Sequence, residues 1–296
     1  MPPDTPPPDP SAELSPGDLR AIEAWLGALR GSAVPVPRPL AFCDDAAVIG
    51  SDFYLMDEVP GRVLEDPRLP GLPRADRHRL QDAMARVLAG IHEVDTGASG
   101  LADYGPGGDY LARQLARWSG QFHATDTGDL PQMARLIAWL ERNLPADDGQ
   151  RGLVHGDYRL DNLILDATTP EIRAVIDWEL STLGHPYADL ASVIMQWSLP
   201  PGPGGCGLAG VDRSRAGLMT DVEFVAAYRH CRGLPPITDF DAYLAFSHFR
   251  MAAILQGVKK RALDGNATNP CGARRLARHI SLLVRQGLEI AERAGG

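Results

Sequence analysis

The stretch "LVHGDYRLDNLILD", residues 153–166, sets several polar side chains among apolar ones. It holds His155, Asp157, Arg159 and Asn162, and the apolar run 163–165 follows at once. A short apolar run of this kind is typical of a buried strand, so the polar residues are expected at the edge of a core. Polar groups in that position cost free energy unless something binds them. The stretch therefore predicts a functional site.

A further acidic residue follows the next apolar run. Asp177 comes directly after "IRAVI" (172–176) and opens "DWELSTLGHPYADLA" (177–191). A turn leaving a strand can aim Asn162 and Asp177 into one cleft, and their oxygens suit Mg²⁺, which one or two carboxylates and substrate phosphates usually hold. Asp157 would then be left to position a hydroxyl nucleophile, the division of roles that phosphoryl transfer requires.

Each part of this pattern also has a simpler explanation. The tripeptide H-G-D alone is a weak signal, because Asp caps turns and Gly permits them. The "IDW" that contains Asp177 could be only the end of a strand. The D-x4-N spacing joined to an Asp after the next strand is much rarer, and it favours a kinase-type phosphate site.

Composition narrows the function classes. The chain has 296 residues, with 29 Lys and Arg against 38 Asp and Glu, and a net charge of −9. This acidic balance argues against a nucleic-acid partner. No apolar run is long enough to span a bilayer, so we expect no membrane partner. The four cysteines form no C-x-x-C pair, which indicates neither a metal cage nor a disulfide framework and fits the reducing cytoplasm.

The order of patterns divides the chain into three predicted parts. Residues 1–17 are rich in proline and lack the basic start and apolar core of a signal peptide, so we expect a disordered tail. Residues 18–60 should form one helix that ends at Gly31, followed by two strands. Residues 61–296 should be mainly helical, with a short β insertion between 150 and 180.

The helical period is clear over most of the last part. The predicted helices are 74–93, 108–123, 130–144, 186–198, 220–231, 239–264 and 271–293. Between two of them, the Gly- and Pro-rich segment 199–210 is expected to form a lid or an irregular connection.

The segments "HGDYRLDN" and "VIDWELSTLGHPYADLA" resemble the aminoglycoside phosphotransferase and choline kinase-like superfamily, which has a protein-kinase-like fold. Within it, "FYLMDEVPGRV", "GGDYLARQLARWSGQF" and "FSHFRMAAILQGV" are similar to a branch associated with acyl-CoA dehydrogenases. The resemblance runs from about residue 19 to the end. It implies an α+β fold with a truncated, small β-containing N-lobe and a large, mainly helical C-lobe.

The resemblance implies roles for the residues that match its motifs. Asp157 resembles the catalytic base, and His155 resembles the residue that braces the catalytic loop. Asn162 and Asp177 match the Mg²⁺ ligands, and Asp189 matches the buried acid that holds the catalytic-loop backbone.

Two further assignments follow from the same likeness. The segment "MDEV" (56–59) resembles the hinge, where backbone groups around Asp57, Glu58 and Val59 would hydrogen-bond the adenine of ATP. Arg159 is a candidate substrate contact. The implied reaction is transfer of the ATP γ-phosphate to a hydroxyl of a small molecule, and the dehydrogenase-associated branch suggests an acyl-type substrate.

One part of the family pattern is not found in this chain. The nucleotide lobe of this fold begins with a Gly-rich hairpin and a strand that carries a lysine. No Gly-rich segment precedes residue 19, and the first lysine is Lys259. We expect a shortened gene model or a natural truncation. The alternative functions are a catalytically impaired or inactive kinase-like binding module and, third, a metal-dependent phosphoesterase.

Overall fold

The structure is a computed structural model. It describes residues 22, 26–27, 29, 31–98, 107–202, 205–267 and 269–294, and for 205–206 it describes the backbone only. The expected tail, residues 1–17, lies outside the described residues. Within the predicted first helix, Ile22, Leu26 and Leu29 are helical and buried, as expected of apolar residues spaced three and four apart on one face of a helix.

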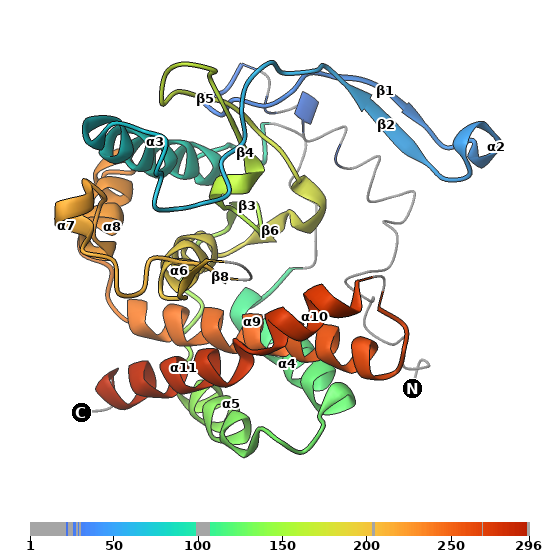
Figure 1. Cartoon of the computed structure of the whole chain (residues 1–296), viewed down its shortest axis with the longest axis vertical. Coiled ribbons are helices and arrows are strands. Elements are labelled where there is room, and N and C mark those ends of the chain that lie inside the picture. The colour runs from blue at the N-terminus through green and yellow to red at the C-terminus, as the bar shows by residue number, and fades with distance from the viewer. Residues whose placement is uncertain are drawn as a thin grey trace.

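Helices make up most of the molecule (Figure 1). The helices are α2 (Ala46–Ile49), α3 (Arg74–His92), α4 (Tyr110–Thr125), α5 (Pro131–Asn143), α6 (Tyr187–Trp197), α7 (Arg213–Ala216), α8 (Asp221–Cys231), α9 (Phe240–Leu263), α10 (Pro270–Ala277) and α11 (Ile280–Ala294), with 3-10 turns η1 (Leu160–Asn162) and η2 (Trp178–Leu180). Long α9 packs against α4, α5, α6, α10 and α11, and α3 packs against α8.

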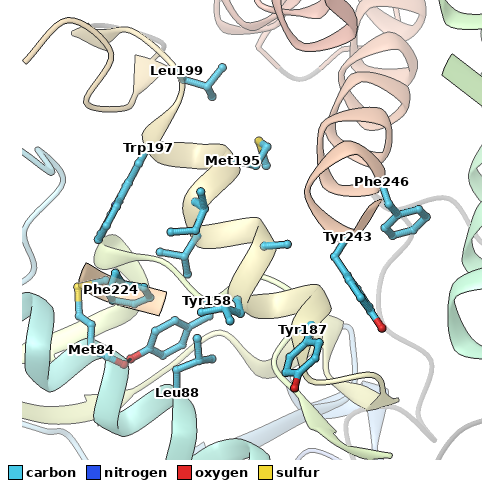
Figure 2. Close-up of a cluster of buried hydrophobic side chains, with 14 of the residues drawn as sticks. Met84, Leu88, Tyr158, Tyr187, Met195, Trp197, Leu199, Phe224, Tyr243 and Phe246 are labelled. Atoms are coloured by element: carbon cyan, nitrogen blue, oxygen red, sulfur yellow. Dashed lines mark hydrogen bonds between the residues drawn. The ribbon is translucent and has the colours of Figure 1, made fainter. Parts of the chain in front are cut away.

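The core is built around α6. All eleven residues of this helix are buried, as expected of a helix that is apolar on nearly every face. Figure 2 shows Met195 and Trp197 on α6, with Phe224 from α8, Tyr243 and Phe246 from α9 around them. Because α6 begins directly after the β insertion, this packing fixes the position of the loops that carry the predicted site.

In the part of the chain that the structure describes, the strands form four small antiparallel pairs. They are β1 (Pro39–Cys43) with β2 (Phe53–Met56), β3 (Gly152–Val154) with β6 (Thr182–Gly184), β4 (Leu163–Leu165) with β5 (Ile172–Val175), and β7 (Pro201–Gly202) with β8 (Gly205–Cys206). The β1–β2 ribbon extends away from the helices, with α2 at its tip (Figure 1). The apolar side chains of Leu40, Leu55 and Met56 are exposed on this ribbon.

Most of the predicted elements are confirmed to within two residues, including both runs of the β insertion. The prediction of a single helix over 271–293 is wrong, because the helix is interrupted between α10 and α11. Arg278 and His279 donate to the carbonyls three residues before them, which tightens the turn and starts a new helix at buried Ile280. No Gly or Pro marks this break in the sequence.

The later part of the segment 199–210 is held to the end of α6, and residues 203–204 lie outside the described residues. The Leu208 N–H donates to the Trp197 carbonyl at 2.8 Å, and the Ala209 N–H donates to the Leu199 carbonyl at 3.0 Å. These bonds favour the irregular connection over the lid. In the part of the chain that the structure describes, no helix is both long and apolar enough to cross a membrane.

The hinge segment is joined directly to the β insertion. Arg62 and Leu165 exchange two backbone hydrogen bonds, at 2.9 and 2.8 Å. Gly61 passes so close to this strand that an added Cβ would lie 2.3 Å from the Leu165 carbonyl oxygen. A second connection is the bond from the Val175 N–H to the Pro35 carbonyl, at 2.8 Å. The small lobe is therefore positioned by backbone pairing with β4 and β5.

We predict that Gly61→Ala lowers the free energy of unfolding by about 1–3 kcal/mol, because the methyl group would force the hinge away from Leu165. Urea unfolding measures this loss. The control is Gly71→Ala, since a Cβ at Gly71 would meet nothing within 4 Å. Equal stability of the two variants would contradict the pairing described above.

Candidate active site

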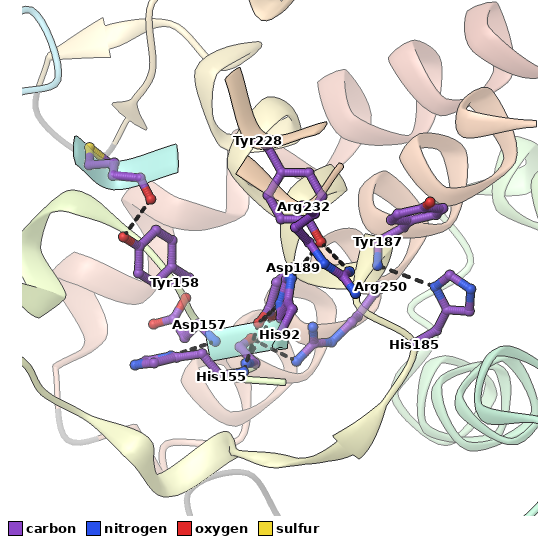
Figure 3. Close-up of polar contacts among 12 residues, drawn as sticks. His92, His155, Asp157, Tyr158, His185, Tyr187, Asp189, Tyr228, Arg232 and Arg250 are labelled. Atoms are coloured by element: carbon purple, nitrogen blue, oxygen red, sulfur yellow. Dashed lines mark hydrogen bonds and ion pairs between the residues drawn. The ribbon is translucent and has the colours of Figure 1, made fainter. Parts of the chain in front are cut away.

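Asp189 holds the backbone of the predicted catalytic loop. It lies in the first turn of α6 and is fully buried. Its carboxylate accepts hydrogen bonds from the backbone N–H groups of His155, at 2.7 Å, and Gly156, at 2.9 Å (Figure 3). Gly156 has a φ of +85°, and an added Cβ would lie 2.4 Å from the Leu180 carbonyl oxygen, so this position requires glycine.

A chain of hydrogen bonds leads from Asp189 through the protein. His92 Nε2 lies 3.3 Å from the Asp189 carboxylate, and His92 Nδ1 lies 2.7 Å from the Tyr228 hydroxyl. Arg232 in turn donates to the same hydroxyl at 2.8 Å. The consistent arrangement has a neutral His92 that donates to Asp189 and accepts from Tyr228. Burial lowers the pKa of His92, which agrees with the neutral form.

The pKa of the Asp189 carboxyl group is nevertheless lowered. Burial by itself would raise this pKa, but the side-chain hydrogen bond of His92 and the backbone hydrogen bond of His155 more than offset the effect of burial. A buried carboxylate that is fully hydrogen-bonded is a rigid fixed point, and leaving it unpaired would be costly. The loop that carries Asp157 is therefore attached to the most buried part of the molecule.

His155 connects the catalytic loop to the loop that carries Asp177. Its Nε2 donates to the Ile176 carbonyl at 3.0 Å, and its Nδ1 accepts from the Asp157 N–H at 3.3 Å. The ring packs against Trp178 with 4.6 Å between centroids. Burial lowers the pKa of His155, so a neutral ring that braces both loops is favoured over a proton-transferring one.

Asp157, Asn162 and Asp177 are brought together by these loops. The Asn162 side chain donates to the Asp157 carbonyl at 2.9 Å, and the same nitrogen lies 3.3 Å from the Asp157 carboxylate. The Ile176 N–H donates to the Asn162 carbonyl at 3.0 Å. Because Asp177 directly follows Ile176, this bond holds Asp177 close to Asn162. Asp177 is exposed and has a φ of +66°, a strained conformation for a residue other than Gly.

Negative charge gathers on this side of the site. Desolvation raises the pKa of Glu179, and the charges of Asp177 and Asp157 raise it further. Burial also raises the pKa of Tyr54 on β2, with further contributions from Asp177 and Glu179. The acidic group of the β insertion therefore faces the inner end of the small lobe.

These residues fit a divalent cation. Asp177 offers carboxylate oxygens close to Asp157 and Glu179, and the Asn162 amide offers an oxygen on the branch opposite its hydrogen-bonded nitrogen. Both are hard ligands of the kind Mg²⁺ prefers. Within the described ranges no three His, Cys, Asp or Glu side chains form a metal cluster, so this donor set needs substrate phosphates or water to complete it.

The predicted hinge lies at the end of β2. The Asp57 N–H donates to the Arg38 carbonyl at 2.9 Å, and its carboxylate pairs with the Arg38 guanidinium. This leaves the Asp57 carbonyl and the Val59 N–H as the candidate contacts for the adenine ring of a nucleotide. The Glu58 side chain is exposed.

Arg159 is not free to contact a substrate in this structure. Its guanidinium forms a two-pronged ion pair with Asp161, two residues along the chain. Its charge still acts on Asp157. Burial raises the pKa of the Asp157 carboxyl group, and the positive charge of Arg159 partly lowers it.

Several residues of the site carried no clear signal in the sequence. His92 belongs to no motif, although its place four residues after Leu88 on the apolar face of α3 predicts burial. Its partner Tyr228 lies on α8, and Arg232, which donates to Tyr228, is the residue after that helix. Only the tertiary packing brings them close to His92. His185 has a structural role, since its ring accepts a hydrogen bond from the Tyr187 N–H and contacts the Tyr243 hydroxyl.

A buried acid that holds the backbone of the loop before Asp157, with Asn162 and Asp177 on the neighbouring turns, is the arrangement expected of a kinase-like phosphotransferase fold. The sequence profile of the phosphotransferase enzyme family matches residues 7–229, which is most of the chain. The chain belongs to this family, and its expected likeness to the dehydrogenase-associated branch is confirmed.

Known proteins support this placement at several levels. Mouse acyl-CoA dehydrogenase family member 10 is 44% identical over 261 residues, covering 88% of the chain but only 24% of that protein. The chain thus spans about a quarter of this relative. A crystal structure of a candidate aminoglycoside phosphotransferase from Ralstonia eutropha is 41% identical with a TM-score of 0.89, covering 95% of this chain and 85% of that one.

A more distant structure shares the fold alone. Spectinomycin phosphotransferase, solved in complex with ADP and spectinomycin, is 13% identical with a TM-score of 0.58. The alignment covers 91% of this chain and 82% of that one. The α+β, kinase-like fold with a mainly helical C-lobe is therefore confirmed.

We predict that Asp189→Asn lowers the free energy of unfolding by about 2–4 kcal/mol, because the amide replaces the carboxylate that accepts from two N–H groups and His92. Urea unfolding at neutral pH measures the change. The control, Asp82→Asn, removes the partner of Arg86 in an exposed ion pair and should cost less than about 1 kcal/mol. Similar losses in both variants would contradict the role of Asp189.

Proposed function

We propose that this chain is a small-molecule kinase that transfers the γ-phosphate of ATP to a hydroxyl group, with Asp157 as the base. The observation that carries this proposal is the junction of Asp157, Asn162 and Asp177 at the ends of β3, β4 and β5. Membership of the phosphotransferase family supports the reaction class.

Asp157 has the environment of a base. It lies at the tip of a loop whose backbone is fixed by Asp189, and it is only partly exposed. Burial raises the pKa of its carboxyl group, while the charges of Arg159 and Arg250 pull the pKa back down. A carboxylate with a raised pKa accepts a proton better than an exposed one, and the Asn162 amide fixes its orientation. Asp157 would orient the attacking hydroxyl and take its proton.

Asn162 and Asp177 would hold Mg²⁺, which when bound neutralises the charge of the phosphates. The acidic surroundings of Asp177 and Glu179 favour a cation at this side of Asp157. The Asp57 carbonyl and the Val59 N–H would bind the adenine, and the pairing of Arg62 with Leu165 would hold this hinge beside the β insertion.

The acceptor is proposed to be a small hydroxylated molecule of the cytoplasm. The likeness to acyl-CoA dehydrogenase family members suggests an acyl-type compound. Spectinomycin is the ligand of a protein that shares only the fold, so it does not identify the acceptor here.

One observation favours a second candidate, a kinase-like binding module with little turnover. The two lysines of the chain are Lys259 and Lys260, and they pair with Asp129 and Asp264 at the end of α9. Neither therefore serves as the phosphate clamp that other kinases place in the small lobe. Losing one such donor typically costs about 10²–10³ in rate, so the two candidates differ in turnover more than in binding.

We predict that Asp157→Asn lowers the rate of phosphoryl transfer by at least about 100-fold, because the amide cannot accept the hydroxyl proton. The measurement is ADP release with Mg-ATP and a panel of hydroxylated compounds. Asp166→Asn, in the turn between β4 and β5, is the matched control and should keep the rate. ATP binding without any transfer in the unaltered chain would favour the binding module.

The rate of phosphoryl transfer should depend on pH, and the same assay measures this dependence. The rate should fall as the pH drops through the pKa of Asp157, which burial places above that of an ordinary carboxyl group. Arg159→Gln removes a positive charge that favours the ionised form, so the pKa should rise and the acid limb should move to higher pH. Arg173→Gln, an exposed arginine on β5, should leave the limb in place. A shift to lower pH in Arg159→Gln would argue against Asp157 as the base.

A further inference from the structure

Positive charge lies beside Asp157. Arg250 of α9 donates from Nη2 to the Gly156 carbonyl at 3.2 Å, directly before the proposed base, and its charge reaches the Asp157 carboxylate (Figure 3). Asp177 and Glu179, in contrast, act on Tyr54 of the small lobe. Asp157 therefore stands between an acidic group toward the hinge and a basic group toward the helices.

A second arginine joins Arg250 from another helix. Arg117 of α4 and Arg250 both lie over the ring of Trp118, with Cζ atoms 5.2 and 5.8 Å from its centroid. Trp118 is only 4% exposed, and its indole N–H donates to Gln114, so the ring is a fixed platform. The packing of α4 on α9 brings the two guanidinium groups to this one ring.

The two charges are close and uncompensated. Over the residues that the structure describes, neither Arg117 nor Arg250 forms an ion pair, and Arg117 donates no hydrogen bond. Arg250 Nε is buried without a hydrogen-bond partner. Arg117 is exposed overall, but desolvation of its guanidinium and repulsion by Arg250 together lower its pKa. In a chain with a net charge of −9, two unpaired neighbouring arginines are costly unless they bind something.

A purely structural role explains only part of this arrangement. Arg250 could serve only to hold the Gly156 carbonyl, and that bond uses one of its five N–H donors. Among the described residues Arg117 donates no hydrogen bond, and its contact with the Trp118 ring leaves its charge without an acidic partner. The pair is better explained by a ligand group that carries negative charge.

We propose that Arg117 and Arg250 bind an anionic oxygen group, a carboxylate or a phosphate, on the molecule that presents its hydroxyl to Asp157. Guanidinium groups match the geometry of both kinds of anion, and a flat aromatic ring holds them in place. Arg117 is the exposed contact, and Arg250 supplies the charge between the anion and the base. This proposal rests on the proposed function, and it makes the acceptor a hydroxylated acid or phosphate ester. A cationic aminoglycoside would meet like charge here.

The test uses inorganic phosphate and acetate as separate probes on the full chain without nucleotide or Mg²⁺. Chemical shifts of the Trp118 indole N–H, followed by NMR, give the dissociation constant of each. At least one anion should bind, and Arg117→Gln should weaken it by about tenfold or more, as loss of a charged hydrogen bond implies. Arg113→Gln, one turn earlier on α4 and bound to the carbonyls of Gly107 and Gly108, should change binding less than about twofold.

The two probes separate the two sources of charge, since binding of acetate indicates a carboxylate and binding of phosphate alone indicates a phosphate ester. Absence of binding by both, or binding that Arg117→Gln leaves unchanged, would overturn the anion site.

A second measurement on the same samples follows phosphoryl transfer from Mg-ATP to matched pairs of a neutral and an anionic alcohol. The pairs are glycerol with glycerol 3-phosphate, and 3-hydroxybutyramide with 3-hydroxybutyrate. Arginine-dependent anion binding without transfer would overturn the kinase and keep this site. If the neutral and the anionic alcohol of each pair are phosphorylated at equal rates, and Arg117→Gln leaves these rates unchanged, the anion site is overturned and the kinase is kept.

Discussion

The buried carboxylate of Asp189 is the constraint on which the rest of the site depends. It fixes the backbone of His155 and Gly156, and His92 keeps it ionised in a place where burial alone would favour the neutral acid. The fixed loop then sets the position of Asp157, and through Asn162 and Ile176 it sets the position of Asp177. A hydrogen-bond chain from Arg232 through Tyr228 supports this anchor from the far side.

The charges around Asp157 are arranged in two groups. Acidic side chains of the β insertion lie toward the small lobe, where a cation and a nucleotide would bind, and two arginines from α4 and α9 lie toward the helices. The phosphate donor is therefore expected on the acidic side of Asp157, and the anionic acceptor is proposed to bind on the arginine side. The fold alone would not distinguish acceptors, so the arginines carry the information about substrate class.

The sequence predicted the parts of this site that are close in the chain. Asp157 and Asn162 share one loop, and Asp177 ends the paired strand, so spacing and strand pattern were enough to bring them together. His92, Arg117 and Arg250 lie on separate helices, and a side chain's orientation across helices depends on tertiary packing that no local pattern reports. The break between α10 and α11 was missed for a related reason, because a turn of three-residue hydrogen bonds needs no Gly or Pro.

The most direct test of the central claim is the binding of Mn²⁺, used in place of Mg²⁺, measured by electron paramagnetic resonance with and without ADP. If Asp157, Asn162 and Asp177 form one phosphate and cation site, ADP should create one tight Mn²⁺ site that Asp177→Asn abolishes and that Asp166→Asn leaves intact. Mn²⁺ binding that is independent of ADP, or that survives Asp177→Asn unchanged, would contradict the account.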